Sequence, residues 1–191
     1  AANAVYECRA RGIFRKERMT PLAGDRVMIE LLGEGKGVLS QILDRRNQLV
    51  RPPVANLDCL VIVVSIADPA PVPLLVDQMV AIAEKNHIEP VIVINKSDLG
   101  DTRQWEETYR LAGLPVFALS ALDAEATAPL RQALAGKLSA FTGNSGVGKS
   151  SLLNAMYPTL SLETGEISQK LGRGRHTTRA VTLYTLPEGG Y

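Results

Sequence analysis

The stretch that decides the fold is Gly143-Asn144-Ser145-Gly146-Val147-Gly148-Lys149-Ser150. A short apolar run, residues 138–142, comes directly before it, and a helical pattern, residues 151–156, comes directly after. This order is typical of a phosphate-binding loop, because glycines let the backbone amides turn inward and the helix start adds unpaired amides and a positive dipole end. The sequence therefore predicts that a nucleotide's phosphates bind here.

Individual roles follow from the chemistry of the loop. Lys149 is expected to reach the β and γ phosphates and neutralise charge, Ser150 to bind Mg²⁺ through its hydroxyl, and Ser151 to touch the α-phosphate. The predicted phosphate-binding residues are Gly143, Asn144, Ser145, Gly146, Val147, Gly148, Lys149, Ser150 and Ser151.

A second motif, Asn95-Lys96-Ser97-Asp98, follows another apolar run, residues 91–94. The Asp98 carboxylate can accept hydrogen bonds from the ring N–H and the exocyclic amine of guanine, a donor pair that adenine lacks. Asn95 is expected to bridge the base and the phosphate loop, and the Lys96 stem to lie along the purine face. Alone, the motif could equally be a polar loop after a buried strand.

The next apolar run along the chain is followed by Ser120-Ala121, which is placed to offer a backbone amide to the guanine oxygen. Ligands of open α/β sheets bind outside the carboxyl ends of the strands, so the three loops should converge on one crevice. This agreement favours GTP over ATP. The base motif precedes the phosphate loop, whereas ordinary GTPases have the opposite order, so the sequence predicts a circularly permuted domain.

The pattern of apolar residues changes near residue 51. Residues 1–51 contain short strand patterns separated by turns and predict a small all-β domain, with strands at 5–9, 21–25, 26–32 and 37–43. Residues 52–191 alternate apolar runs with helical patterns, which predicts an α/β domain with a mostly parallel sheet and helices on both faces. Strands are expected at 60–66, 91–94, 116–119 and 138–142, and helices at 74–86, 102–112, 127–134 and 151–156.

Charge and cysteine content indicate what kind of partner the protein has and in which compartment it works. Residues 1–51 carry ten Lys or Arg against six Asp or Glu, and the rest carries eleven against fourteen. A basic module suggests a polyanion partner, although such an excess is also common on ordinary surfaces. Cys8 and Cys59 have no metal-ligand spacing and are expected to be buried free thiols. The apolar run at 57–67 contains Asp58 and is too short to cross a membrane, so a cytoplasmic protein is expected.

A basic segment, Gly172-Arg173-Gly174-Arg175-His176-Thr177-Thr178-Arg179, follows the phosphate loop at the place of a first switch loop. Thr177 or Thr178 would then sense Mg²⁺ and the γ-phosphate, and Thr178 is the predicted metal ligand. His176 is either catalytic or incidental, and the segment could otherwise be a solvated loop. Residues 181–186 are expected to form an edge strand, and Tyr191 to begin a returning strand.

Taken together, these residues resemble the ribosome small-subunit-dependent GTPase family of circularly permuted GTPases. The similarity spans nearly the whole chain. It rests on Cys8 to Gly12, Gly24 to Val27, the connector at residues 47–56, the two nucleotide motifs, and residues 174–178.

The resemblance implies an amino-terminal OB-type barrel that contacts ribosomal RNA, in agreement with the basic charge. The candidate RNA contacts are Arg9, Arg11, Arg15, Lys16 and Arg18, with Tyr6 and Phe14 as either stacking or core aromatics. About fifty residues is short for such a barrel, so a first strand is expected to be missing.

The resemblance also implies GTP hydrolysis to GDP and phosphate, with Lys149 and His176 as catalytic residues and the small ribosomal subunit and its rRNA as partners. Family members carry an Asp-x-x-Gly switch and a zinc-binding domain, which are expected beyond Tyr191. A monomer is expected. The rival interpretations are an RNA-binding protein that uses GTP only as a ligand, and a permuted GTPase of the large subunit.

Overall fold

The structure is a computed structural model that describes residues 4–12, 14, 19–162 and 181–191. The chain divides into two compact units, Ala1–Asn56 and Leu57–Tyr191. The predicted domain division after residue 51 stays a prediction.

The first unit consists of short strands, as predicted for an all-β module. Its three-stranded sheet has the order β1-β3-β2, in which β3 pairs parallel with β1 and antiparallel with β2. A separate antiparallel pair, β4 with β5, follows in the connector. The bounds are β1 Glu7–Ala10, β2 Val27–Gly33, β3 Lys36–Ile42, β4 Gln48–Leu49 and β5 Val54–Ala55. Closure of this sheet into an OB-type barrel stays a prediction.

The strand expected at residues 21–25 is wrong. Only Ala23 pairs there, through a single parallel bridge to Val54. The Asp25 carboxylate accepts a hydrogen bond from the Leu22 amide at 2.7 Å, and Gly24 has a φ of 85°. Both features make a turn, because a carboxylate that binds a nearby backbone amide competes with strand pairing.

The second unit contains a four-stranded sheet in which every strand is parallel, with the order β8-β7-β6-β9. The bounds are β6 Cys59–Ser65, β7 Glu89–Asn95, β8 Val116–Ala118 and β9 Ser139–Thr142. All seven residues of β6 are buried, which explains its continuous apolar sequence. The predicted α/β domain with a parallel sheet is confirmed.

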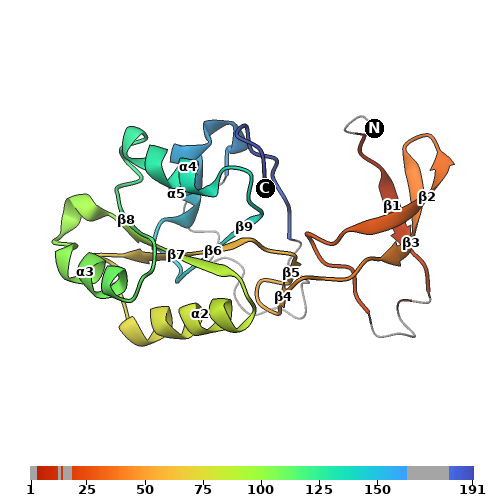
Figure 1. Ribbon diagram of the computed structural model, residues 1–191. Helices are drawn as coiled ribbons and strands as arrows, with labels where there is room; N and C mark the ends of the chain where they lie inside the picture. Colours follow the sequence, from red (N-terminus) through yellow and green to blue (C-terminus); the bar gives the residue numbers. More distant parts are fainter. Residues whose placement is uncertain (1–3, 13, 15–18, 163–180) are drawn as a thin grey trace, which may run out of the picture. The chain divides into compact units, whose positions relative to one another are not determined.

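Helices cover both faces of this sheet (Figure 1). The bounds are α2 Pro73–Lys85, α3 Arg103–Leu111, α4 Ala128–Leu134 and α5 Lys149–Met156, with 3₁₀ turns η1 Ser97–Leu99, η2 Glu125–Thr127 and η3 Pro158–Leu160. Figure 1 shows α2 and α3 on one side and α4 and α5 on the other. Alternate β6 residues such as Val61 and Val63 pack with Leu130, Leu152 and Met156 of the second helix pair.

Helix α5 begins two residues earlier than the predicted range. Gly148 precedes it in the left-handed conformation, with a φ of 90°, so the helix starts at Lys149. This places the phosphate-loop lysine and serines in the first turn, where backbone amides have no partner inside the helix.

The edge strand expected at residues 181–186 is wrong, because none of these positions pairs as a strand with another described residue. Tyr191 instead lies against the free edge of β9. Its amide donates to the Lys137 carbonyl at 3.0 Å, and its carbonyl accepts from the Ser139 amide at 2.8 Å. The structure assigns no strand at Tyr191, so the returning strand expected there stays a prediction.

Two smaller expectations have mixed outcomes. Cys59 is a buried free thiol, whereas Cys8 is exposed, so the prediction that both are buried is wrong for Cys8. Cys8 lies in β1, whose four residues are all exposed. Within the described residues, no helix is both long and apolar enough to span a membrane.

Candidate functional site

One buried asparagine joins the three predicted loops. Asn95 ends β7 and is only 1% exposed. Its amide nitrogen donates to the Val147 carbonyl in the phosphate loop at 2.8 Å, and its amide oxygen accepts from the Ala121 backbone amide at 3.0 Å. The base motif, the Ser120-Ala121 loop and the phosphate loop therefore meet at one edge of the sheet, as predicted from their positions after parallel strands.

Two glycines of the phosphate loop occupy positions that only glycine fits. Gly143 has a φ of 144°, and an added Cβ would lie 2.2 Å from the Val63 carbonyl oxygen of β6. Gly148 has a φ of 90°, and an added Cβ would lie 2.4 Å from Nδ2 of Asn95. The loop thus turns tightly against the sheet and against the base motif.

The loop presents donors on its inner side. The backbone amides of Lys149, Ser150 and Ser151 have no acceptor within the described part of the chain, as expected for the first turn of a helix. The Lys149 ammonium donates to the carbonyls of Gly143 at 2.9 Å and Asn144 at 2.7 Å. Burial lowers the pKa of Lys149. An anion in the loop would offset this cost of burial, so the donor set fits a nucleotide's phosphates.

The base motif is shaped by the 3₁₀ turn η1. Lys96 has a left-handed backbone, with a φ of 60°, which is costly for a residue with a Cβ and typical of functional sites. The Ser97 amide donates to the Leu119 carbonyl at 3.2 Å, which ties η1 to the end of β8. Asp98 is exposed, and no described residue forms a hydrogen bond or ion pair with its carboxylate. The carboxylate is therefore available to a base.

The Ser120-Ala121 loop differs from the simplest expectation. Its Ala121 amide, expected to donate to the guanine oxygen, donates instead to Asn95. The Ser120 hydroxyl accepts from the Leu122 amide at 3.3 Å. The loop is thus already ordered by the protein, and a guanine oxygen would share the Ala121 amide with Asn95.

Several predicted residues lie outside the described residues. They are His176, Thr177 and Thr178 of the switch segment, and Arg15, Lys16 and Arg18 of the basic segment. Their roles stay predictions. Among the described candidates for RNA contact, Arg9 is exposed, Arg11 forms an ion pair with Glu30, and Phe14 is 5% exposed and therefore a core residue. Tyr6 is partly exposed.

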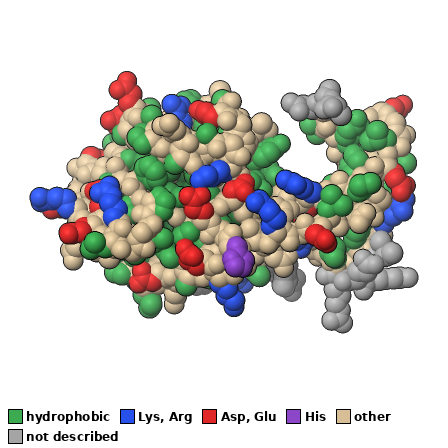
Figure 2. All heavy atoms as spheres, in the orientation of Figure 1, with side chains coloured by type: hydrophobic (Ala, Val, Ile, Leu, Met, Phe, Trp, Pro, Cys, Tyr) green, Lys and Arg blue, Asp and Glu red, His purple; other side chains and the backbone are tan. Residues whose placement is uncertain are grey.

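Basic and acidic side chains are interspersed on the visible face of the molecule (Figure 2). No group of three or more His, Cys, Asp or Glu that could hold a metal lies together in the described ranges. The chemistry that remains for Mg²⁺ is the Ser150 hydroxyl, an oxygen donor of the kind that Mg²⁺ prefers when phosphates supply the other ligands.

The sequence patterns missed one contributor to the site, the loop that follows β6. The carbonyl of Asp68 accepts a hydrogen bond from the Lys96 ammonium, and Pro69 lies beside Gly146. The two prolines at positions 69 and 71 marked a loop but carried no nucleotide motif, so no pattern could identify this role.

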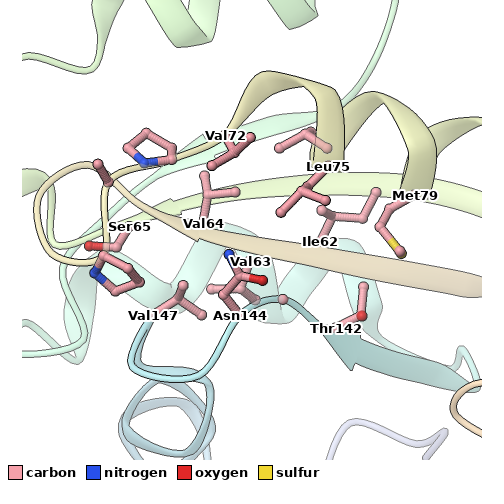
Figure 3. Close-up of a pocket in the computed structure, with 15 residues that line it drawn as sticks. Ile62, Val63, Val64, Ser65, Val72, Leu75, Met79, Thr142, Asn144 and Val147 are labelled. Carbon is pink, nitrogen blue, oxygen red and sulfur yellow. The ribbon is translucent and has the colours of Figure 1, made fainter.

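A hollow of about 220 Å³ lies beside the phosphate loop, between β6 and α2 (Figure 3). Ile62, Val64, Leu75 and Met79 line it on one side, and Asn144 and Val147 on the other. Its lining is mainly apolar, which does not suit phosphates, so the hollow is a neighbour of the nucleotide site and not its phosphate pocket.

Comparison with known proteins identifies the matching family. A family model described as RsgA GTPase matches residues 42–191, and one described as RsgA N-terminal domain matches residues 1–39. Two relatives named small ribosomal subunit biogenesis GTPase RsgA are 47% identical over 98% of this chain, from Caldanaerobacter subterraneus, and 43% identical over 95% of it, from Bacillus subtilis. The chain covers 64% and 63% of their lengths, just under two thirds.

Two solved structures have a similar fold. YjeQ from Thermotoga maritima has a TM-score of 0.70 and 39% identity, over 83% of this chain and 59% of that one. YloQ, described as a circularly permuted GTPase, has a TM-score of 0.65 and 40% identity, over 81% of this chain and 56% of that one. The circularly permuted fold predicted from the motif order is therefore confirmed.

Proposed function

Because this chain belongs to the RsgA GTPase family, we propose that it binds GTP and hydrolyses it to GDP and phosphate. The observation that carries the proposal is the Asn95 side chain, which holds the guanine motif and the phosphate loop together. Two independent recognition elements, one for a base and one for phosphates, thus share a single side chain.

The residues divide the work as follows. Asp98 reads guanine through its free carboxylate, and the stem of Lys96 lies along the purine face, with Ser97 holding the turn. The first-turn amides of α5 and the Lys149 ammonium hold the β and γ phosphates and neutralise the charge that develops as a water attacks in line. Ser150 would hold Mg²⁺ through its hydroxyl, and the ion would supply further neutralisation of the phosphate charge.

We also propose roles for the switch segment. Thr178, or its neighbour Thr177, would complete the Mg²⁺ site, and His176 would orient the attacking water. These residues lie outside the described part of the chain. The threonine role rests on the position of the segment after a phosphate loop, and the His176 role rests on the family resemblance.

The proposed partner is the small ribosomal subunit, through its rRNA. Relatives named small ribosomal subunit biogenesis GTPase support this partner, together with the basic excess in residues 1–51. Turnover by the protein alone would then be slow, because the partner would complete the catalytic site. We propose that the protein acts in the cytoplasm as a monomer.

Release of phosphate tests the activity directly. The full-length protein is expected to release phosphate from GTP and not from ATP, and faster with small subunits than without. Lys149→Ala is expected to abolish release. GTP binding without phosphate release, even with small subunits, would favour a GTP-liganded RNA-binding protein instead.

Two further experiments test the role of His176 and the identity of the ribosomal partner. If His176→Ala turned over as fast as the unaltered protein with small subunits present, His176 would have no catalytic role. Co-sedimentation with separated subunits tests the partner, and association with the large subunit alone would contradict it.

A further inference from the structure

The loop at residues 66–72, which connects β6 to α2, is anchored to the base motif at its start. We refer to it as the proline loop, after Pro69 and Pro71. The Ile66 amide donates to the Asn95 carbonyl at 3.1 Å. The Ser65 hydroxyl, which is fully buried, accepts from the Ala67 amide at 3.3 Å. The first half of the proline loop is therefore fixed beside the end of β7.

The proline loop then holds the lysine of the base motif. The Lys96 ammonium donates a hydrogen bond to the Asp68 carbonyl. The backbone of Lys96 is left-handed at this point, with a φ of 60°. A lysine with four rotatable bonds is ordinarily mobile, so tethering its ammonium fixes the direction of its stem.

The next residue lies beside the phosphate loop. A Cβ added to Gly146 would lie 3.4 Å from Cδ of Pro69, which is ordinary van der Waals contact. Pro69 and Val72 of the proline loop line the same hollow as Asn144 and Val147 of the phosphate loop (Figure 3). The proline loop therefore binds the base motif through Lys96 and runs beside the phosphate loop.

We propose that the proline loop is a fourth wall of the nucleotide site and that Pro69 is a positioning residue that acts through Lys96. Its ring restricts the backbone next to the Asp68 carbonyl and keeps that carbonyl within reach of the Lys96 ammonium. The proposal rests on the proposed GTP binding. It assigns to the proline loop an effect on nucleotide affinity that the three motifs do not account for.

The test is the dissociation constant of GDP and of inosine diphosphate for the full-length protein. Pro69→Gly removes the restriction on the backbone. It is expected to raise the dissociation constants of both nucleotides by the same factor, about fivefold, because the Lys96 stem lies along any purine. Only Asp98 distinguishes the two, since it accepts a hydrogen bond from the exocyclic amine that inosine lacks. Asp98→Asn, in contrast, should change the ratio between the two nucleotides. Pro71→Gly is the matched control, with the same change in the same loop, and should leave both constants within about twofold.

A double-mutant cycle shows whether Pro69 acts through Lys96. In a Lys96→Met background, Pro69→Gly is expected to weaken GDP by less than about twofold, because the group that it positions is gone. A general folding defect would instead lower the number of binding sites and weaken both backgrounds equally. If Pro69→Gly does not fold, the milder change Pro69→Ala takes its place. It is expected to weaken GDP binding in the presence of Lys96 and much less in the Lys96→Met background.

The outcomes separate this inference from the proposed function. If the unaltered protein binds neither GDP nor GTP, the proposed function fails. If it binds them and Pro69→Gly binds as tightly as Pro71→Gly, or if its effect is the same with and without Lys96, the positioning role is overturned while the function stands.

Discussion

Single residues at this site act mainly by geometry. Asn95 provides no chemistry, yet its amide group is shared between a carbonyl and an amide of two loops that are far from it in sequence. Gly148 is needed because its backbone passes so close to that side chain. Buried polar groups of this kind are costly when unpaired, so the fit around Asn95 constrains every neighbour.

The fit between Gly148 and Asn95 can be tested with a matched pair of alanine variants. Gly148→Ala should lower the free energy of unfolding by more than about 2 kcal/mol and weaken GDP at least tenfold, because the new Cβ must displace Asn95 and break a buried hydrogen bond. Gly113 also has a positive φ, 80°, but has open space at its Cβ position. Gly113→Ala therefore measures the backbone strain alone, about 1 kcal/mol, with GDP binding unchanged.

These values come from denaturant unfolding and from titration with a fluorescent GDP. Equal losses of stability and affinity in the two variants would show that the close approach to Asn95 has no cost of its own.

The two cysteines should differ sharply in reactivity. Burial, with a smaller contribution from Glu89, raises the pKa of Cys59 to about 12. A colorimetric thiol reagent at pH 8 should therefore modify the exposed Cys8 quickly and Cys59 only after unfolding. Cys8→Ser should then show no fast reaction, and a fast reaction in that variant would contradict the buried position.

The same pKa shift predicts the sign of a pH effect on stability. The raised pKa means that the folded state keeps the proton on Cys59 more firmly than the unfolded chain does. The resulting stabilisation is complete below about pH 9 and is lost as the pH rises toward 12. In Cys59→Ala, the free energy of unfolding should fall less steeply over that pH range.

At the scale of elements, an ion pair stabilises the turns of the first unit. The Asp25 carboxylate, 2% exposed, accepts hydrogen bonds from Nε of Arg45 at 2.7 Å and from Nη2 at 2.9 Å. Arg45 also donates to the Thr20 carbonyl at 2.7 Å. Asp25 belongs to the stretch that supported the family resemblance, and in the structure it joins the turn at Leu22 to Arg45, which follows β3.

Removing the arginine should be costly, because it leaves a buried carboxylate without a partner. We expect Arg45→Ala to lower the free energy of unfolding of the first unit by about 3 kcal/mol. The control is Arg103→Ala, which removes an ion pair with Asp101 in which the arginine side chain is 88% exposed, and which should leave stability almost unchanged. Equal effects in urea unfolding would contradict the structural role given to Asp25.

For the whole molecule, the parallel sheet brings loops from residues 95, 121 and 147 to one edge, and a nucleotide there should stabilise the fold by mass action. A guanine nucleotide at a hundred times its dissociation constant should add about 2.7 kcal/mol and raise the unfolding temperature. The same concentration of ATP should have almost no effect. Calorimetry checks this, and equal shifts with ATP would contradict guanine recognition by Asp98.

The sequence by itself determined the class of this molecule and its permuted order. Glycine loops, Asn95 to Asp98 and the uninterrupted apolar strand at β6 are local signals, because each motif needs particular residue types at fixed spacing. Helix and strand positions in the second unit followed within one or two residues at most ends. The same local reasoning failed at residues 21–25, where the Asp25 carboxylate holds a turn. It also failed at residues 181–186, because a strand forms only where a pairing partner is present, whatever the strand propensity of its residues.

Only the tertiary structure decided how the motifs cooperate. No sequence pattern could show that the Ala121 amide donates a hydrogen bond to Asn95, or that the Asn95 side chain leaves no room for a Cβ at position 148. Nor could a pattern show that the Asp68 carbonyl accepts a hydrogen bond from Lys96. These contacts join residues up to about fifty positions apart. They depend on sheet register and on the path of loops, which the folded chain sets by packing as a whole, whereas a sequence motif records only what its own residues require.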